Sequence, residues 1–351
     1  MEPMQRLSTG LVIASLALGG VAAFACSNSM EAQSSPTSNN GDPNDPSDPN
    51  DPDASSPDLV DAAAPTEPEP LVEGGRPPRC NDAGECTCIN IASIGRTATY
   101  GLGEDNTDAF VTWLNDNSSA AVDLHITKPT LSMDFLLNYD VIILQALEDD
   151  EYGALWTFTA DEAAALAQWV EAGGGLITLM GYGADAHEVE PTNFLLQFAN
   201  IAYNRDDPFT TCPDNLCYCW GNSISVVGLD PSHPVSANIS LLPLFHGRSI
   251  DAPDGTVIGQ SDGIVYAVGQ QVGNGRIFAF ADEWVTYTSQ WLGTGQTQEI
   301  NTYDPCYDET NGWMMTADKV FQVAQFWYNA ILWAAPLMEC EFRIEDPNIV
   351  Y

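Results

Sequence analysis

Two adjacent carboxylates, Asp282 and Glu283, directly follow the mostly apolar run 276–281 and precede Trp284. Such a run predicts a buried strand, and ligands of parallel sheets bind beyond the carboxyl ends of the strands. Paired carboxylates can share the proton transfers of hydrolysis, one as acid and the other as base. Asp282 and Glu283 are therefore candidate catalytic residues, and Trp284 is a candidate ligand-binding residue. The structural alternative is that the two acids only cap the loop after the strand.

A second polar segment, residues 181–187, follows the apolar run 176–180 and holds a tyrosine between two glycines. It supplies three candidate ligand-binding side chains, Tyr182, Asp185 and His187. Aromatic faces beside carboxylates suit sugar binding. No cofactor is required, but Asp185 and His187 together with Asp282 leave a divalent metal open, although their spacing matches no metal motif. The structural alternatives are packing of Tyr182 over the sheet and a solvated loop position for His187.

A third polar segment, Gln145 with 148–151, should converge with these two at the carboxyl ends of the strands. Alternating strand and helix patterns predict the scaffold that positions all three segments. Strands are predicted at 88–95, 121–126, 139–146, 176–180, 256–260, 264–271 and 276–281, and helices at 107–114, 163–170 and 319–335. The continuous apolar run 139–146 is typical of a parallel strand buried on both faces. Thr159 and Glu162 form a capping box before the second helix. The fold class predicted is α/β: a doubly wound, mostly parallel (flavodoxin-like) sheet with a β-hairpin extension and a C-terminal helix.

The N-terminal part carries targeting signals instead of a domain pattern. Residues 1–25 predict a signal peptide, because the apolar run 11–25 has fifteen residues and a spanning helix needs about 20. The run ends at Cys26, in a sequence that resembles a bacterial lipobox, so Cys26 is the predicted lipidation site. Cleavage near Ala25 without lipidation is the alternative. Residues 26–79 are rich in Pro, Asp and Ser and predict a disordered tether. The folded domain is expected at 80–351.

The charge balance limits the partners. Against 49 Asp plus Glu, the chain has 10 Lys plus Arg, a formal net charge of −39. Nucleic acid and anionic membrane surfaces would repel such a chain, so no nucleic-acid partner is expected. Carbohydrate or an envelope protein remains open as a partner, and the membrane is reached through the lipid anchor. The structural alternative is that the charge only keeps an exported protein soluble.

Eight cysteines follow the tether, an even number that predicts disulfides in an exported chain. They are Cys80, Cys86, Cys88, Cys212, Cys217, Cys219, Cys306 and Cys340. Their pairing is left open by the sequence. A four-thiolate zinc site is the alternative, but the two C-x-C clusters are tighter than the usual ligand spacing.

Four stretches in this order resemble the class I glutamine amidotransferase-like superfamily, and within it the ThuA-like (trehalose-utilisation) proteins. The stretches are WVEAGGGL at 169–176, DPSHPV at 230–235, GNGRIF at 273–278 and NAILWA at 329–334. The resemblance spans roughly residues 88–336 and implies the doubly wound scaffold. Amidotransferases carry a nucleophilic Cys after the strand that follows the triple glycine, and ThuA-like proteins tend to have a His there. Here that position is Met180. The resemblance therefore implies the scaffold without the amidotransferase reaction.

These observations predict an exported bacterial lipoprotein of the cell envelope, on its periplasmic or surface side. Its domain is expected to be a ligand-binding or accessory module, with a glycan as one ligand class. Two alternatives stay open. The domain is an extracytoplasmic hydrolase that uses Asp282 and Glu283 with or without a metal, or it is a module that binds another envelope protein.

Overall fold

The computed structural model describes residues 80, 84, 86–96, 106–149, 153–180, 186–208, 217–218, 224–240, 242–245, 247–286, 307–308, 312–313, 322–336, 340–346 and 349–351. The predicted signal peptide, the predicted tether and Cys26 lie outside these residues. No helix in the described ranges is both long enough and apolar enough to cross a membrane.

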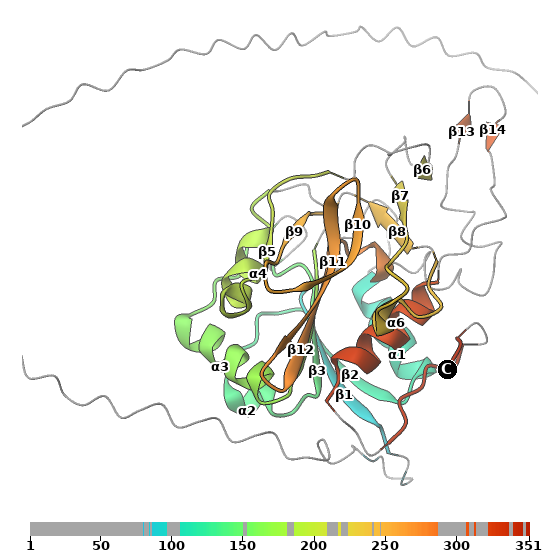
Figure 1. Ribbon diagram of the computed structural model, residues 1–351. Coiled ribbons are helices and arrows are strands. Elements are labelled where there is room, and N and C mark those ends of the chain that lie inside the picture. The colour runs from blue at the N-terminus through green and yellow to red at the C-terminus, as the bar shows by residue number, and fades with distance from the viewer. Residues whose placement is uncertain are drawn as a thin grey trace, which may run out of the picture. The chain divides into compact units, whose positions relative to one another are not determined.

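A seven-stranded sheet forms the centre of the fold (Figure 1). Its order is β10 (Thr256–Ser261), β11 (Ile264–Val272), β12 (Gly275–Phe280), β4 (Gly175–Leu179), β3 (Val141–Leu144), β1 (Ile89–Ile94) and β2 (Ala120–His125). The five strands from β12 to β2 run parallel, and β11 runs antiparallel to both of its neighbours. The order β2-β1-β3-β4-β12 is that of flavodoxin-like sheets. The predicted fold class is confirmed.

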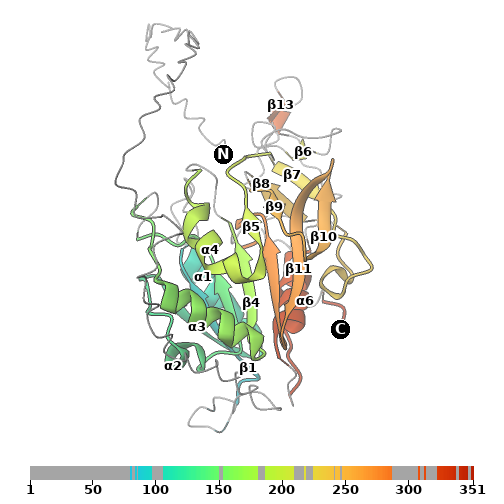
Figure 2. The same ribbon diagram turned by 60° about the vertical axis from the view of Figure 1, so that its left-hand side comes forward.

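The hairpin extension lies at one end of this sheet. Strands β10 and β11 extend the sheet beyond its parallel part (Figure 2). The hairpin partner of β11, β12, is itself an interior strand, because it pairs with β4 on its other side. Every residue of β1, β3 and β4 is buried, as expected for parallel strands covered on both faces.

Helices cover the two faces of the sheet (Figure 1). On one side lie α3 (Ala160–Glu171) and α4 (Val189–Leu196), and on the other lie α1 (Asn106–Asn117) and α6 (Val323–Ala334). The short α2 is Met133–Leu136. Phe110 of α1 and Trp327 of α6 pack with ring centroids 4.5 Å apart. The sequence patterns predicted neither α2 nor α4.

The capping box predicted at the start of α3 is present. Glu162 N donates to Thr159 Oγ1 over 3.2 Å, and Thr159 N donates to Glu162 Oε2 over 2.8 Å. Burial raises the pKa of Glu162, but the hydrogen bonds from Lys128 and from the Thr159 and Leu131 backbones together lower it below its ordinary value. The charged Glu162 carboxylate, in the first turn of α3, therefore fixes the N-terminus of this helix. The helix N-terminus in turn stabilises that negative charge.

The triple glycine after α3 is required by close packing. Gly173 has φ +125°, in the region that favours glycine. A Cβ on Gly174 would lie 2.4 Å from the Trp169 ring, and a Cβ on Gly175 would lie 2.4 Å from Ala334 O. The glycines thus let the chain turn from α3 directly into β4 beneath α6.

Smaller elements complete the described chain. They are β5 (Ala202–Tyr203), β6 (Cys217–Tyr218), β7 (Ile224–Val227), β8 (Leu242–Phe245), β9 (Ile250–Asp251), β13 (Tyr307–Asp308), β14 (Gly312–Trp313) and the 3-10 turns η1 (Gln197–Ala199), η3 (Pro234–Ser236) and η4 (Trp284–Thr286). Strand β5 pairs with β9, and β6, β7 and β8 form a separate antiparallel sheet.

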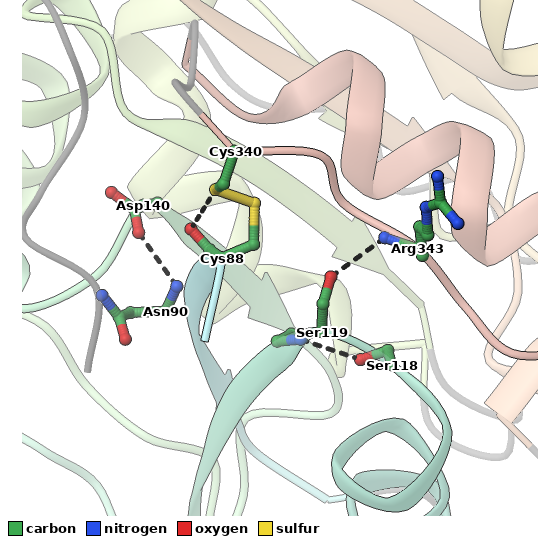
Figure 3. The surroundings of a disulfide bond; sticks show 8 residues. Cys88, Asn90, Ser118, Ser119, Asp140, Cys340 and Arg343 are labelled. Carbon is green, nitrogen blue, oxygen red and sulfur yellow. Dashed lines mark hydrogen bonds between the residues drawn. A yellow bond between two sulfur atoms is a disulfide. The ribbon is translucent and has the colours of Figure 1, made fainter. Parts of the chain in front are cut away.

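Two disulfides confirm part of the cysteine prediction. Cys80 pairs with Cys86, and Cys88 at the start of β1 pairs with Cys340 (Figure 3). Near the second bond, Arg343 N donates to Ser119 Oγ over 3.0 Å, which helps to fix the C-terminal segment beside β2. Disulfides of this kind are typical of oxidising compartments, and they remove these four thiols from the zinc alternative. Cys212, Cys219, Cys306 and the side chain of Cys217 lie outside the described part.

Candidate functional site

The two segments predicted to converge begin at neighbouring strand ends. In the parallel pair β4–β12, Leu179 stands opposite Phe280. The chain therefore leaves both strands at the same edge of the sheet, through Met180 on one side and Ala281 on the other. Residues 181–185, which include Tyr182 and Asp185, lie outside the described chain. Met180, the residue that follows β4, is buried.

Asp282 and Glu283 are both buried, with 1% of each residue exposed. The chain around them is fixed: Thr286 N and Thr286 Oγ1 donate to Glu283 O over 2.8 and 2.7 Å. Trp327 Nε1 of α6 donates to Val285 O over 2.8 Å. Burial of a carboxylate is costly unless bonds compensate for the lost water, so this pair is not an ordinary solvated loop. Trp284 belongs to the same turn, but its side chain lies outside the described part.

The segment that contains Arg248 also contacts this edge of the sheet, and the sequence patterns did not predict it. Arg248 N donates to Ala281 O over 3.0 Å, directly before Asp282. Its guanidinium is buried: Nε donates to Glu188 Oε1 over 2.8 Å, and Nη1 donates to Asp206 O. The arginine thereby connects the end of β12 to the residue that precedes α4. A signal existed in the sequence, because arginine is rare in this acidic chain.

The junction of β1 and β3, where flavodoxin-like sheets usually bind ligands, is filled by the chain itself. Arg96 and Ala146 exchange backbone hydrogen bonds of 2.9 and 3.0 Å across it. Gln145 Nε2 donates to Ser93 Oγ over 2.7 Å. A Cβ on Gly95, which has φ +100°, would lie 2.5 Å from Ala146 O. Gln145 therefore packs within this junction. Because the junction is filled, a ligand is expected at the ends of β4 and β12 instead.

His187 and Asp149 each have a polar contact within the described ranges. His187 is exposed, and its Nδ1 lies 2.7 Å from Glu190 Oε1, as the solvated-loop alternative expects. Asp149 of the acidic segment accepts a bond from Trp156 Nε1 over 2.8 Å. Within the described chain, no three His, Cys, Asp or Glu side chains are arranged to hold a metal ion.

A surface hollow of about 390 Å³ lies between α4 and the β5 region. It is lined by Val189, Glu190, Asn193, Phe194, Gln197, Tyr203, Asn204 and Arg205. Tyr203 forms part of its wall and reaches the carboxyl edge, because its hydroxyl bonds to Thr178 O and Phe280 O over 3.0 and 3.1 Å. Burial raises the pKa of Tyr203 far above its ordinary value, so the phenol stays protonated as a donor. The sequence patterns did not predict this hollow.

A separate polar cluster lies on the edge strand β2. Tyr139 OH donates to Asp123 Oδ2 over 3.0 Å and lies 3.0 Å from His125 Nε2. Burial lowers the pKa of His125, and the charge of Asp123 only partly opposes that effect. The imidazole is therefore kept neutral near pH 7, which makes this cluster a source of pH-dependent stability.

The sequence matches no model of a known protein family and no curated protein. Similar solved structures include the cytoplasmic protein STM1381 from Salmonella typhimurium LT2, at 16% identity and TM-score 0.46, covering 70% of this chain and 100% of that one. They also include putative ThuA-like proteins from Bacteroides uniformis (17%, TM-score 0.35, 59% and 86%) and from Parabacteroides merdae (16%, TM-score 0.33, 56% and 79%). At these values the similarities fix neither a family nor an activity.

Proposed function

We propose that this chain is an exported, lipid-anchored protein of the cell envelope whose domain is ThuA-like, lacks amidotransferase chemistry and binds a glycan at the carboxyl edge of its sheet. The observation that carries the proposal is the burial of Asp282 and Glu283 at the end of β12, next to the segment of the buried Arg248. Ionisable groups buried at strand ends are costly, and they concentrate at functional sites.

The location outside the cytoplasm is supported by two features. The disulfides Cys80–Cys86 and Cys88–Cys340 suit an oxidising compartment. The apolar run that ends at Cys26, followed by a Pro- and Asp-rich segment, suits a lipid anchor with a tether. Lipidation of Cys26 would place the domain near the membrane surface, where polymeric glycans of the envelope are available as ligands.

Binding is preferred to catalysis because the resembled nucleophile position holds Met180. The test uses the full chain in detergent and titrates four hexasaccharides, of glucose, mannose, galactose and N-acetylglucosamine, by calorimetry. One of them should bind, and Asp282→Asn or Glu283→Gln should weaken it about tenfold, which is about 1.4 kcal/mol. Asp262→Asn, in the exposed β10–β11 turn, is the matched control and should leave the affinity unchanged.

The hydrolase alternative is favoured by the adjacency of two buried carboxylates. Shortening of a hexasaccharide with time, lost in Asp282→Asn and Glu283→Gln, would support it, and its dependence on added Zn²⁺, Mg²⁺ or Ca²⁺ would show whether a metal takes part. The interaction-module alternative is favoured by the filled β1–β3 junction. Should Asp282→Asn and Glu283→Gln both keep full affinity, the carboxyl-edge proposal is wrong.

A further inference from the structure

We infer that the hollow between α4 and β5 is a binding subsite for a single neutral sugar residue. The inference rests on the proposed glycan binding, but it assigns a place that Asp282 and Glu283 do not form. About 390 Å³ is within the usual range for small-ligand sites and leaves room for a pyranose ring.

The wall of the hollow offers an aromatic surface. Phe194 is half-buried, and its ring has no aromatic partner in the described part of the chain. A pyranose presents one face of C–H groups and a rim of hydroxyls. The C–H face can cover the Phe194 ring and remove its apolar surface from water.

The rim of the hollow offers hydrogen-bonding groups of both kinds. The exposed amide of Gln197 makes no side-chain hydrogen bond to the described residues, so it can donate and accept at once. Arg205 uses Nη2 to bind Glu190 Oε1, which leaves other guanidinium N–H groups for a ligand. Asn204 donates from Nδ2 to Ser249 Oγ over 2.9 Å. Sugar hydroxyls both donate and accept, and they match this mixture.

The charges of the hollow select a neutral ligand. Arg205 and Glu190 contribute one charge of each sign and are paired with each other. An anion bound to the remaining guanidinium N–H groups would lie beside the Glu190 carboxylate, in a chain of net charge −39. A metal ion would meet a guanidinium beside the only carboxylate among the lining residues. A hydroxyl-rich ring satisfies both partners without separating them.

The floor of the hollow is rigid, which reduces the cost of binding. Asn193 Nδ2 donates to Tyr203 O and Asn193 Oδ1 accepts from Tyr203 N, both over 2.8 Å. The Tyr203 hydroxyl is held by Thr178 O and Phe280 O at the carboxyl edge. Because Asn193 and Tyr203 are held in place by these hydrogen bonds, they need no reordering when a ligand binds. The subsite is thereby connected to the strand end that precedes Asp282.

The test titrates the same four hexasaccharides into the full chain with Phe194→Leu, Gln197→Ala and Arg205→Gln. Each substitution should weaken binding about tenfold. Phe198→Leu, a half-buried phenylalanine outside the hollow, is the matched control and should bind like the wild type. Saturation-transfer NMR should mark the C–H protons of one sugar face, and the signal should fall in Phe194→Leu. Thermal unfolding checks that the variants fold.

The outcomes separate the two proposals. Loss of binding in the hollow variants but not in Asp282→Asn supports the subsite and removes the carboxyl-edge site. Loss in Asp282→Asn alone, with the hollow variants unchanged, overturns the subsite and leaves the proposed function intact. Loss in both sets supports one continuous site. If none of the four hexasaccharides binds, the sugar subsite and the glycan-binding function proposed above are both wrong.

Discussion

Arg248 Nε donates a hydrogen bond of 2.8 Å to Glu188 Oε1, although 60 positions separate the two residues. Both side chains are withdrawn from water, with 2% and 13% exposed. The pair joins the residue before α4 to the segment that bonds to the end of β12. This buried ion pair therefore helps to hold together two parts of the chain that border the candidate site.

Breaking this pair should strongly destabilise the domain. Arg248→Met removes the buried cation that pairs with the largely buried Glu188 carboxylate, so we expect a loss of about 3–5 kcal/mol in the free energy of unfolding. Urea denaturation of the full chain measures the loss. The double variant Arg248→Met with Glu188→Leu should recover part of it, because both charges are then absent.

The matched control is Arg205→Met, which removes the exposed pair between Arg205 and Glu190, with 54% and 49% exposed. Water screens such a pair, so the expected loss is less than about 1 kcal/mol. Equal losses for Arg205→Met and Arg248→Met would contradict the role given to burial.

The Cys88–Cys340 disulfide should stabilise the domain more than Cys80–Cys86. It joins residues 252 positions apart, whereas the other bond joins residues 6 apart, and a longer closed loop restricts the unfolded chain more. The double variant Cys88→Ser with Cys340→Ser should lower the free energy of unfolding, measured by urea denaturation, by about 2–4 kcal/mol. The Cys80/Cys86 double variant should lower it by less. Without reductant, iodoacetamide should label none of these four cysteines. Rapid labelling of Cys88 or Cys340 would rule out the pairing.

Stability should fall as the pH drops below 6.5, the ordinary pKa of histidine. Burial lowers the pKa of both His125 and His233, and the carboxylates Asp123 and Asp230 only partly oppose it. The unfolded chain therefore takes up protons at a higher pH than the folded chain, so the folded state loses stability until its own histidines titrate. Each histidine contributes at most about 1.4 kcal/mol per pH unit. Urea unfolding between pH 7.5 and 5.5 measures the slope.

The variants His125→Gln and His233→Asn should flatten that slope. The glutamine can still bond Tyr139, and the asparagine can replace His233 Nδ1 as the acceptor for Val235 N, which now lies 3.2 Å away. Both variants remove the titrating ring and keep a polar group. An unchanged slope in the double variant would show that other groups cause the pH dependence.

Cys26 should carry the membrane anchor. Cys26→Ser removes the only thiol at the end of the apolar run 11–25, so the protein should move from the membrane fraction to the soluble exported fraction. Mass spectrometry of the wild-type N-terminus should show an added lipid on Cys26. A wild type that is fully soluble and carries no added mass would disprove the lipidation.

The sequence alone determined the central scaffold. The runs at 88–95, 139–146 and 176–180 predicted buried strands, because each is short and mostly apolar. The capping box at Thr159 and the glycines at 173–175 fixed the ends of α3 for local reasons, since caps and turns depend on neighbouring residues. The even set of cysteines indicated disulfides, although it could not indicate which residues pair.

The tertiary structure decided everything that depends on contacts between distant parts of the chain. It placed β12 inside the sheet beside β4, filled the β1–β3 junction through Arg96 and Ala146, and paired Cys88 with Cys340. It also brought Arg248 to the end of β12 and Tyr203 across the ends of β4 and β12. Short polar segments between 186 and 251 carry no periodic pattern, so their positions follow from packing and long-range hydrogen bonds, which a local pattern does not encode.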